Sequence, residues 1–352
     1  MAHRVSVASS QNQFREGSVE TTSHLSRLSL RVKVLPLIAA LLLVNAAPVS
    51  AQTYPKRPVN LVVGYAAGGT GDVIARIIAQ KLSDELGQSV VVENRPGASG
   101  GIAAHAVARA EPDGHTILVG QSAEIAINPH WMKGITYDPA KDLQPVALGV
   151  IVPLGLVVPA KAPYSSLREL INDAHNSKKG ASYASAGTGT PSHFAAELLK
   201  LRTQSKISHV PYKGAGPALN DLVGGHVDLY FPGLPAVIGN VRSGQLKLLA
   251  VSSGVRSSIF PEIPTVAEVV DIPGYDITLW IGFFVPRGTP PEIVNRLNQE
   301  INKVLTQPDV KARFIGEGAD VKPMSVDQFA NFVKAESEKY AQIIKDTGFS
   351  PE

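Results

Sequence analysis

The sequence predicts an α/β protein made of two lobes that are joined by crossing strands. Short β-rich runs alternate with helical periods in two successive series, which is the pattern of two sheets covered by helices. A long apolar stretch, residues 147–159, separates the two series, and another, residues 277–286, follows the second. The composition, 44% hydrophobic and 18% charged, is that of a well-packed globular chain, so each lobe is expected to have a core.

The first series predicts a parallel sheet, because each β-rich run is followed by a helical period long enough to cross back over the sheet. We expect strands at residues 59–65, 90–93 and 116–119, and helices at 73–86 and 102–110.

The second series repeats this rhythm and predicts a second lobe of the same kind. We expect strands at residues 181–185, 208–211, 227–231 and 246–251, and helices at 194–201, 218–223 and 237–241.

The two apolar stretches flank the second series, so we expect them to cross between the lobes and to act as a hinge. Two amphipathic helices follow, at 293–305 and 325–346, and these are expected to pack back on the first lobe. The predicted division is therefore residues 52–150 together with 276–352 as lobe 1, and residues 151–275 as lobe 2.

Residues 1–51 have the features of a cleaved signal peptide. Basic residues precede an apolar run at 34–44, and small residues at Val49 and Ala51 predict cleavage after Ala51. The run is too short to span a bilayer, which needs about 20 residues, so a permanent membrane anchor is disfavoured. The long stretch before the run leaves open whether translation starts downstream of Met1.

Charge and cysteine content exclude several functional classes. Residues 1–51 carry five Lys or Arg and two Asp or Glu, and the remaining chain has 28 of each sign. A neutral mature chain gives no support for nucleic-acid binding. The absence of Cys excludes disulfides, thiolate metal sites and cysteine nucleophiles, and it is compatible with export to a bacterial envelope.

The most informative local motif is the glycine-rich segment 64–72, which joins an apolar strand to an amphipathic helix. Thr70 is expected to be the N-cap and Asp72 a first-turn acid, so unpaired N–H groups would face any nearby anion. The alternative is a turn that merely closes a βα unit. The candidate ligand-binding residues of this segment are Tyr65, Ala67, Gly68, Gly69, Thr70 and Asp72.

Two further helix starts follow strands in the second series. One is predicted at Thr190 as N-cap with Pro191 at the first helical position, and the other at residues 214–217. Three helix N-termini in two lobes favour an anion in the cleft between the lobes over three unrelated turns. The candidates are Ser185, Gly187, Thr188, Gly189, Thr190, His193, Lys213 and Gly214.

Catalytic motifs are weak, and we expect no enzyme activity and no cofactor or metal. The best serine-hydrolase candidate, Ser122, has Glu124 where a nucleophile elbow needs glycine. Ser122 is instead expected to be a strand-end residue lining the cleft. The glycine loops lack the lysine of a phosphate-binding P-loop and a complete dinucleotide motif.

Four other residues have plainer interpretations. Of the scattered histidines, only His193 lies in a predicted cleft motif. Trp131 and Trp280 are expected in the core in preference to cleft walls. Asp113 is expected in a turn.

These motifs together resemble the Bug-type periplasmic solute receptors of tripartite tricarboxylate transporters. The resemblance covers nearly the whole chain after the leader, and the combination of motifs is specific. The motifs are Tyr54-Pro55-Lys56-Arg57-Pro58, Ala67-Gly68-Gly69-Thr70 with Asp72 and Ala75-Arg76, Glu93-Asn94-Arg95-Pro96-Gly97-Ala98, Pro112-Asp113-Gly114, Ser185-Ala186-Gly187 with Gly189-Thr190 and His193, Val210-Pro211-Tyr212-Lys213-Gly214, Pro264-Thr265-Val266-Ala267-Glu268, and Pro286 with Gly288-Thr289-Pro290.

The resemblance implies a type II periplasmic-binding-protein fold with a ligand cleft between its lobes. It further implies capture of a small carboxylate-bearing metabolite for delivery to a membrane permease of the tripartite tricarboxylate transporter type. The loops matching residues 67–70 and 187–190 would hold the carboxylate. We therefore expect a monomeric, periplasmic binding protein, and a ligand sensor that feeds a signalling partner remains the alternative.

The sequence departs from the family pattern at two places. Family members commonly have an acid after the strand that matches residues 227–231, whereas Pro232 and Gly233 follow here. If the family's acid faces the ligand, this departure implies an altered specificity. The segment after Gly120 often carries Thr or His in the family, whereas Ala123-Glu124-Ile125 stands here, and Glu124 would either disfavour highly charged ligands from a position near the cleft or point to solvent.

Overall fold

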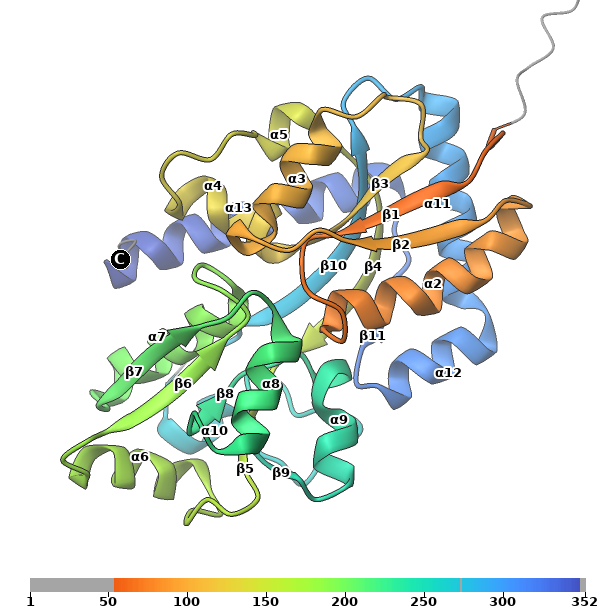
Figure 1. Cartoon of the computed structure of the whole chain (residues 1–352). Coiled ribbons are helices and arrows are strands. Elements are labelled where there is room, and N and C mark those ends of the chain that lie inside the picture. Colours follow the sequence, from red (N-terminus) through yellow and green to blue (C-terminus); the bar gives the residue numbers. More distant parts are fainter. Residues whose placement is uncertain (1–53, 273, 349–352) are drawn as a thin grey trace, which may run out of the picture. The chain divides into compact units, whose positions relative to one another are not determined.

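The computed structural model describes residues 54–272 and 274–348, and their strands form two mixed sheets (Figure 1). The first sheet has the order β11-β4-β10-β3-β1-β2 and the second has the order β7-β6-β8-β5-β9. Both sheets belong to one compact unit that begins at Tyr54. The strands of the first sheet are β1 (Val59–Val63), β2 (Val90–Asn94), β3 (Thr116–Gln121), β4 (Leu143–Pro153), β10 (Thr278–Pro286) and β11 (Asp320–Val321). Those of the second are β5 (Gly155–Pro159), β6 (Ala181–Ser185), β7 (Ile207–Pro211), β8 (Leu229–Tyr230) and β9 (Leu246–Val251).

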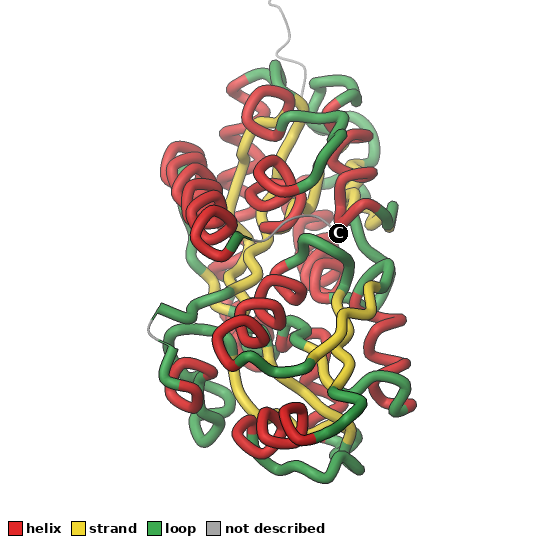
Figure 2. The backbone as a smooth tube through the Cα atoms, turned by 90° about the vertical axis from the view of Figure 1, so that its left-hand side faces the viewer, coloured by secondary structure: helices red, strands yellow, loops and turns green. Residues whose placement is uncertain are grey.

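Helices cover both faces of each sheet, as Figure 2 shows from the side. We call each sheet with its helices a lobe. The helices of the first lobe are α2 (Thr70–Leu86), the 3-10 turn η1 (Ala98–Gly100), α3 (Gly101–Ala108), the π-helix η2 (Ala123–Ile127), α4 (Asn128–Trp131), α5 (Pro139–Asp142), α11 (Pro291–Thr306), α12 (Pro308–Gly316) and α13 (Val326–Thr347). Those of the second lobe are α6 (Leu167–Asn176), α7 (Pro191–Thr203), α8 (Ala215–Gly224), α9 (Leu234–Arg242) and α10 (Val266–Val270).

Strand β1 has buried side chains on both faces of the first sheet. Successive side chains of a strand point to opposite faces: Leu61 and Val63 pack with α2 and α11, whereas Val62 packs with α3 and α13. An almost continuous apolar run is therefore required, as is usual for parallel strands. β1 pairs in parallel with both β2 and β3, which confirms the sheet predicted from the first series.

The second lobe repeats this arrangement. β6 pairs in parallel with β7 and β8, and alternate residues of β5 pack with α6 and α7 on one face and with α8 and α9 on the other. The predicted strand at 227–231 is shorter than expected, because only Leu229–Tyr230 has ladder geometry. Helix α6, which begins at the capping residue Ser166, was not predicted.

The chain crosses between the two sheets twice, and the first crossing lies in the predicted stretch 147–159. The other predicted stretch, 277–286, forms β10 within the first sheet, and the second crossing precedes it. The first runs from β4 through Leu154 into β5, and the second returns from β9 through Ser252 and Ile277 to β10. The fully buried Ser252 hydroxyl joins them: it accepts from the Leu154 N–H (3.1 Å) and donates to the Ile277 carbonyl (2.5 Å). The side chain thus reinforces two backbone bonds of the same residues: the Ser252 N–H donates to the Leu154 carbonyl (2.9 Å) and the Ile277 N–H donates to the Ser252 carbonyl (3.0 Å). The exact lobe boundaries at 150/151 and 275/276 stay a prediction.

The predicted C-terminal helices are confirmed as α11 and α13, and both pack on β4 of the first lobe. The Asp113 turn is also confirmed, since the Asp113 carboxylate accepts from the His115 N–H (3.0 Å) and Gly114 has φ +79°. The predicted signal peptide lies outside the described residues. Within residues 54–272 and 274–348, no helix combines the length and the apolar composition needed to cross a bilayer.

Replacing Ser252 with alanine is expected to destabilise the protein. Ser252→Ala leaves the buried Leu154 N–H without its acceptor, which costs about 1 to 3 kcal/mol. Urea unfolding measures the loss. The exposed Ser243, whose hydroxyl bonds the Asn240 carbonyl, provides the matched control, and Ser243→Ala is expected to change stability by less than about 0.5 kcal/mol. Equal effects in the two variants would contradict the role given to Ser252.

Candidate functional site

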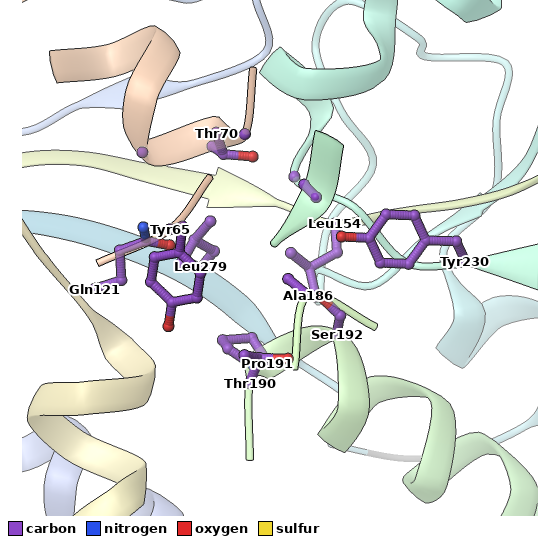
Figure 3. Close-up of a pocket in the computed structure, with 14 residues that line it drawn as sticks. Tyr65, Thr70, Gln121, Leu154, Ala186, Thr190, Pro191, Ser192, Tyr230 and Leu279 are labelled. Atoms are coloured by element: carbon purple, nitrogen blue, oxygen red, sulfur yellow. The ribbon is translucent and has the colours of Figure 1, made fainter. Parts of the chain in front are cut away.

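A pocket lies where the carboxyl ends of strands from both sheets face each other, and we call it the inner pocket (Figure 3). Its cavity volume is only about 30 Å³, so the pocket is narrow. Its lining residues are Tyr65, Gly69, Thr70, Gly71, Gln121, Leu154, Ala186, Thr190, Pro191, Ser192, Ala215, Tyr230, Gly233 and Leu279.

Four helices begin at this pocket. The N-cap residues Gly69 of α2, Thr190 of α7 and Gly233 of α9 line it directly, and α8 contributes its first residue, Ala215. Within the described residues, none of these four helices has a side-chain cap hydrogen bond at its N-terminus. Uncapped first-turn N–H groups and the positive ends of the helix dipoles thus converge on one space. The sequence predicted three of these helix starts. The helix expected at 237–241 begins earlier, at Leu234, and its start was not assigned to the site.

The first glycine loop is held from behind by Asp72. The buried Asp72 carboxylate accepts from the Gly68 N–H (3.0 Å) and from Arg76 (3.0 Å). Burial alone would raise its pKa, but these hydrogen bonds keep the pKa of Asp72 below its ordinary value. Asn94 adds a bond to Asp72 (3.1 Å) and another to the Tyr65 carbonyl (3.0 Å). Asp72 therefore supports the loop from outside the lining of the inner pocket.

The start of helix α2 differs from expectation. The N-cap of α2 is Gly69 (φ −79°, ψ 167°), so the assignment of Thr70 as N-cap is wrong; Thr70 is the first helical residue. The loop is also only partly exposed: Ala67 and Gly68 face solvent, whereas Gly69 is buried. The second lobe covers Gly69, because Ala215 lies 3.6 Å from a Cβ placed there.

The second glycine loop is stabilised by its own polar side chains. Thr190 is the N-cap of α7 as predicted, but its hydroxyl donates to the Gly187 carbonyl (2.6 Å) and not into the helix. The Gly187 N–H donates to Ser185 (3.2 Å) and the Gly189 N–H donates to the His193 Nδ1 atom (3.2 Å). Ser185 and His193 thus position this loop from outside the lining of the inner pocket.

His193 is buried among aromatic rings. Its ring lies 4.4 Å from that of His209 and 5.5 Å from that of Trp131. Burial, together with the charge of His209, lowers the pKa of His193 to about 3. The imidazole is therefore neutral at physiological pH, and the Gly189 hydrogen bond places its proton on Nε2.

The third helix start brings the two lobes into close contact. Gly214 has φ +143°, and a side chain there would lie 2.9 Å from the Ala66 backbone nitrogen. A Cβ at Gly216 would similarly lie 2.8 Å from the Ala67 carbonyl oxygen. Glycine at these positions is what allows the loop after β1 to touch the start of α8.

An outer pocket adjoins the inner one and shares Tyr65 and Ala186 with it. Among the predicted residues, Gly187, Thr188 and the exposed Lys213 line this outer space. Ser99 of the first lobe donates a hydrogen bond to the Thr188 carbonyl of the second lobe. The site residues predicted as one cluster are therefore divided between the inner pocket and the outer pocket. Others, such as Asp72, Ser185 and His193, lie behind the two glycine loops, and we call them the supporting layer.

Ser122 and Glu124 are fully buried. It is Gln121, one residue before Ser122, that lines the inner pocket, because neighbouring strand residues point to opposite sides. Ser122 therefore does not line the inner pocket, contrary to the expectation from the sequence. For Glu124, burial rules out the alternative that it points to solvent.

The Glu124 carboxyl group connects two pocket residues. One oxygen accepts from the Gln121 N–H (2.7 Å) and the other from the Tyr65 hydroxyl (3.0 Å). Burial raises the pKa of Glu124 to about 8, and the hydrogen bonds from Gln121 and Tyr65 only partly oppose this effect. At neutral pH the group is therefore mostly uncharged, and its two hydrogen bonds hold Gln121 and Tyr65 in place beside the inner pocket.

Trp131 and Trp280 are both buried, which confirms the preference for core positions. Trp280 packs among Phe284, Phe329 and Phe332. Trp131 additionally contacts the second lobe, since a Cβ at Gly189 would lie 3.0 Å from its ring.

Several lining residues were missed by the sequence analysis. Gln121 and Tyr230 lie at the carboxyl ends of strands, and this position could have indicated that they line the pocket. Leu154 and Leu279 belong to the crossing region, and only the folded chain brings them to the pocket. No group of three or more His, Asp or Glu side chains suitable for a metal ion occurs in the described part of the chain.

The raised pKa of Glu124 predicts a pH dependence of stability. Between about 4.5 and 8 the folded state retains a proton that the unfolded chain releases, so the free energy of unfolding falls as pH rises through this window. Glu124→Gln, which keeps the shape of the side chain, is expected to give a flatter pH profile in urea unfolding. The exposed Glu262 serves as control, and Glu262→Gln should follow the wild-type profile. Parallel profiles for wild type and Glu124→Gln would contradict the prediction.

Comparison with known proteins identifies the family. Residues 74–349 match the family described as tripartite tricarboxylate transporter family receptor, TctC. Protein BugT of Bordetella pertussis is 40% identical over 304 residues, which cover 86% of this chain and 93% of that protein.

Solved structures show the same fold. Rpa4515 of R. palustris, solved with adipate, is 36% identical with a TM-score of 0.82, and the match covers 85% of this chain and all (100%) of that one. The periplasmic binding protein BugD is 33% identical with a TM-score of 0.81, with 85% and 100% coverage. These matches confirm the predicted periplasmic-binding-protein fold.

The family is one of solute receptors and not of enzymes, in accord with the weak catalytic motifs of the sequence. The chain belongs to the tripartite tricarboxylate transporter family receptors, the Bug-type periplasmic binding proteins.

Proposed function

We propose that this protein captures a small carboxylate-bearing metabolite in the inner pocket. The observation that carries the proposal is the convergence of four helix N-termini on a pocket whose described lining contains no charged side chain. Such a site complements an anion through backbone groups alone. The adipate in the related Rpa4515 structure is a carboxylate ligand of the same kind.

The energies involved are sufficient for useful affinity. A helix N-terminus contributes up to about 2 kcal/mol to a partly buried anion, and a charge-assisted hydrogen bond contributes about 1.5 to 3 kcal/mol. Micromolar binding requires about 8 kcal/mol after the costs of association. Four helix starts together with several charge-assisted hydrogen bonds therefore give the required order of magnitude without an arginine cluster.

Binding would couple to closure of the lobes, because the inner pocket takes residues from both. In this proposal residues 52–150 with 276–352 move against residues 151–275 about the segments that Ser252 joins. The Ser99–Thr188 and Trp131–Gly189 contacts would then belong to the closed state. The predicted residues of the supporting layer, such as Asp72 and His193, would act on the ligand through the loops they hold.

The cellular role follows from the family. We propose that residues 1–51 direct export and are removed, and that the mature, monomeric receptor delivers its ligand in the periplasm to a permease of the tripartite tricarboxylate transporter type. The match of residues 74–349 to the tripartite tricarboxylate transporter family receptors supports this proposal.

Thermal unfolding of the protein from Gln52 onward tests the proposed function. Mono-, di- and tricarboxylates, amino acids, sugars and nucleotides are compared at equal concentration. A ligand at 100 times its Kd stabilises the folded state by about 2.7 kcal/mol, so a clear rise in Tm is expected for some carboxylates. A response limited to sugars or nucleotides would refute carboxylate binding.

A Gly69→Val variant tests the location of the site. The backbone of Gly69 is acceptable for valine (φ −79°), but the side chain would enter the inner pocket beside Ala215. We expect the fold to persist and ligand affinity to fall by about tenfold or more, as measured by calorimetry. Gly239 of α9 is exposed with open space around it, so Gly239→Val should bind like wild type. Unchanged affinity in Gly69→Val would remove the first glycine loop from the site.

A further inference from the structure

We propose that Glu124 couples ligand binding to a proton: the inner pocket accepts an anion tightly only while the Glu124 carboxyl group is protonated. The inference rests on the proposed function and adds a chemical condition to it. The receptor would hold its anion together with one proton, which stays on the protein, and would release the anion when that proton is lost.

The Glu124 carboxyl group is bonded to two residues of the pocket lining. Glu124 belongs to the π-helix η2 that follows β3. One of its carboxyl oxygens accepts from the Gln121 N–H (2.7 Å) and the other accepts from the Tyr65 hydroxyl (3.0 Å). Gln121 and Tyr65 both line the inner pocket (Figure 3). Through either contact, one residue separates the carboxyl group from a ligand.

The carboxyl group is enclosed by protein. The Glu124 side chain is fully buried, and a Cβ at Gly100 would lie 2.5 Å from its Oε2 atom, so this oxygen packs against the backbone of η1. Bulk water therefore screens a charge on Glu124 only weakly, and such a charge acts strongly on an anion in the neighbouring pocket.

No cation contributes to the pKa of Glu124 in the described part of the chain. The titratable groups on the elements around η2 are tyrosines. They are Tyr65 after β1, Tyr137 before α5, whose hydroxyl donates to the Glu124 carbonyl (2.8 Å), and Tyr340 of α13, which packs on η2. Burial raises the pKa of all three tyrosines above the ordinary value, so they stay neutral and offer Glu124 no charge.

An ionised carboxylate without a cation is costly in these surroundings. Burial accordingly raises the pKa of Glu124 to about 8, and the hydrogen bonds from the Gln121 and Glu124 backbone and from Tyr65 oppose the rise only in part. The group is therefore protonated at neutral pH by virtue of its enclosure, and it ionises in mildly alkaline solution.

An anion in the inner pocket places a second negative charge beside this group. It disfavours the ionised form of Glu124 and raises the pKa of Glu124 further. The coupling is reciprocal, so the protonated protein binds the anion more tightly than the ionised protein. The affinity is therefore complete below the pKa of the free protein and falls as pH rises above about 8.

Calorimetry between pH 7 and pH 9.5 tests the coupling, with propionate, succinate, glutarate and adipate as probes at constant ionic strength. These acids are almost fully ionised throughout this range, so a change in affinity reflects the protein. At pH 9.5 about 3% of the free protein would have Glu124 protonated, which limits the loss of affinity to about thirtyfold. We expect the wild type to lose at least fivefold between pH 7 and pH 9.5.

Two variants assign the effect. Glu124→Gln keeps the shape of the side chain and is neutral at every pH, so the ratio of its Kd values at pH 9.5 and pH 7 should approach one. Tyr65→Phe removes a hydrogen bond that lowers the pKa of Glu124, so its affinity should fall at a higher pH than that of the wild type. Glu262→Gln, at an exposed position, is the matched control and should keep the wild-type ratio. Thermal unfolding without ligand at both pH values verifies that each variant is folded.

The possible outcomes separate the inference from the proposed function. Equal wild-type affinity at pH 7 and pH 9.5 overturns the coupling, while carboxylate binding stands. A wild-type ratio in folded Glu124→Gln, or a fall at the wild-type pH in folded Tyr65→Phe, overturns the role of Glu124. Binding of none of the four acids at either pH overturns the proposed carboxylate function and this inference with it.

Discussion

The convergence of four helix N-termini on one pocket is the constraint on which the rest of the site depends. Backbone N–H groups can face a ligand only if no side chain caps them and if chain segments from both lobes approach closely. Gly69, Gly214 and Gly233 satisfy both conditions, since a Cβ at Gly233 would lie 2.5 Å from the Thr70 hydroxyl. Glycine at the helix starts is thus a consequence of backbone recognition in a narrow interlobe space.

Loops built from glycine need external support, and buried polar groups provide it. Asp72 holds the loop after β1 through the Gly68 N–H, and His193 holds the loop after β6 through the Gly189 N–H. Glu124 supports a third segment through the backbone of Gln121. Each supporting group is buried: hydrogen bonds keep Asp72 ionised, whereas burial keeps His193 neutral and Glu124 mostly neutral at neutral pH. The flexibility of glycine is offset by these fixed contacts.

The sequence predicted the framework better than the lining of the site. Strand and helix periods located β1, α2 and β6 within a few residues, because these elements are set by local hydrophobic patterning. The glycine loops were also found, since a helix start after a strand has a local signature. Leu154 and Leu279 were not, because they reach the pocket only through the crossing of the two sheets. The Ser122 expectation missed the lining by one position, which in a strand is enough to reverse the face.

Recognition by backbone groups has a consequence for specificity. Helix N-termini bind any carboxylate, so discrimination among carboxylates has to come from the few side chains that surround the rest of the ligand. Two of these, Leu154 and Leu279, belong to or adjoin the crossing segments, and the Leu154 N–H is bonded to Ser252 where the segments meet. A ligand in the inner pocket would therefore contact the segments about which the lobes are proposed to move. Ligand shape and lobe closure would then be sensed by the same residues, so an acid of the wrong size would fail to stabilise the closed state even when its carboxylate is correctly bound.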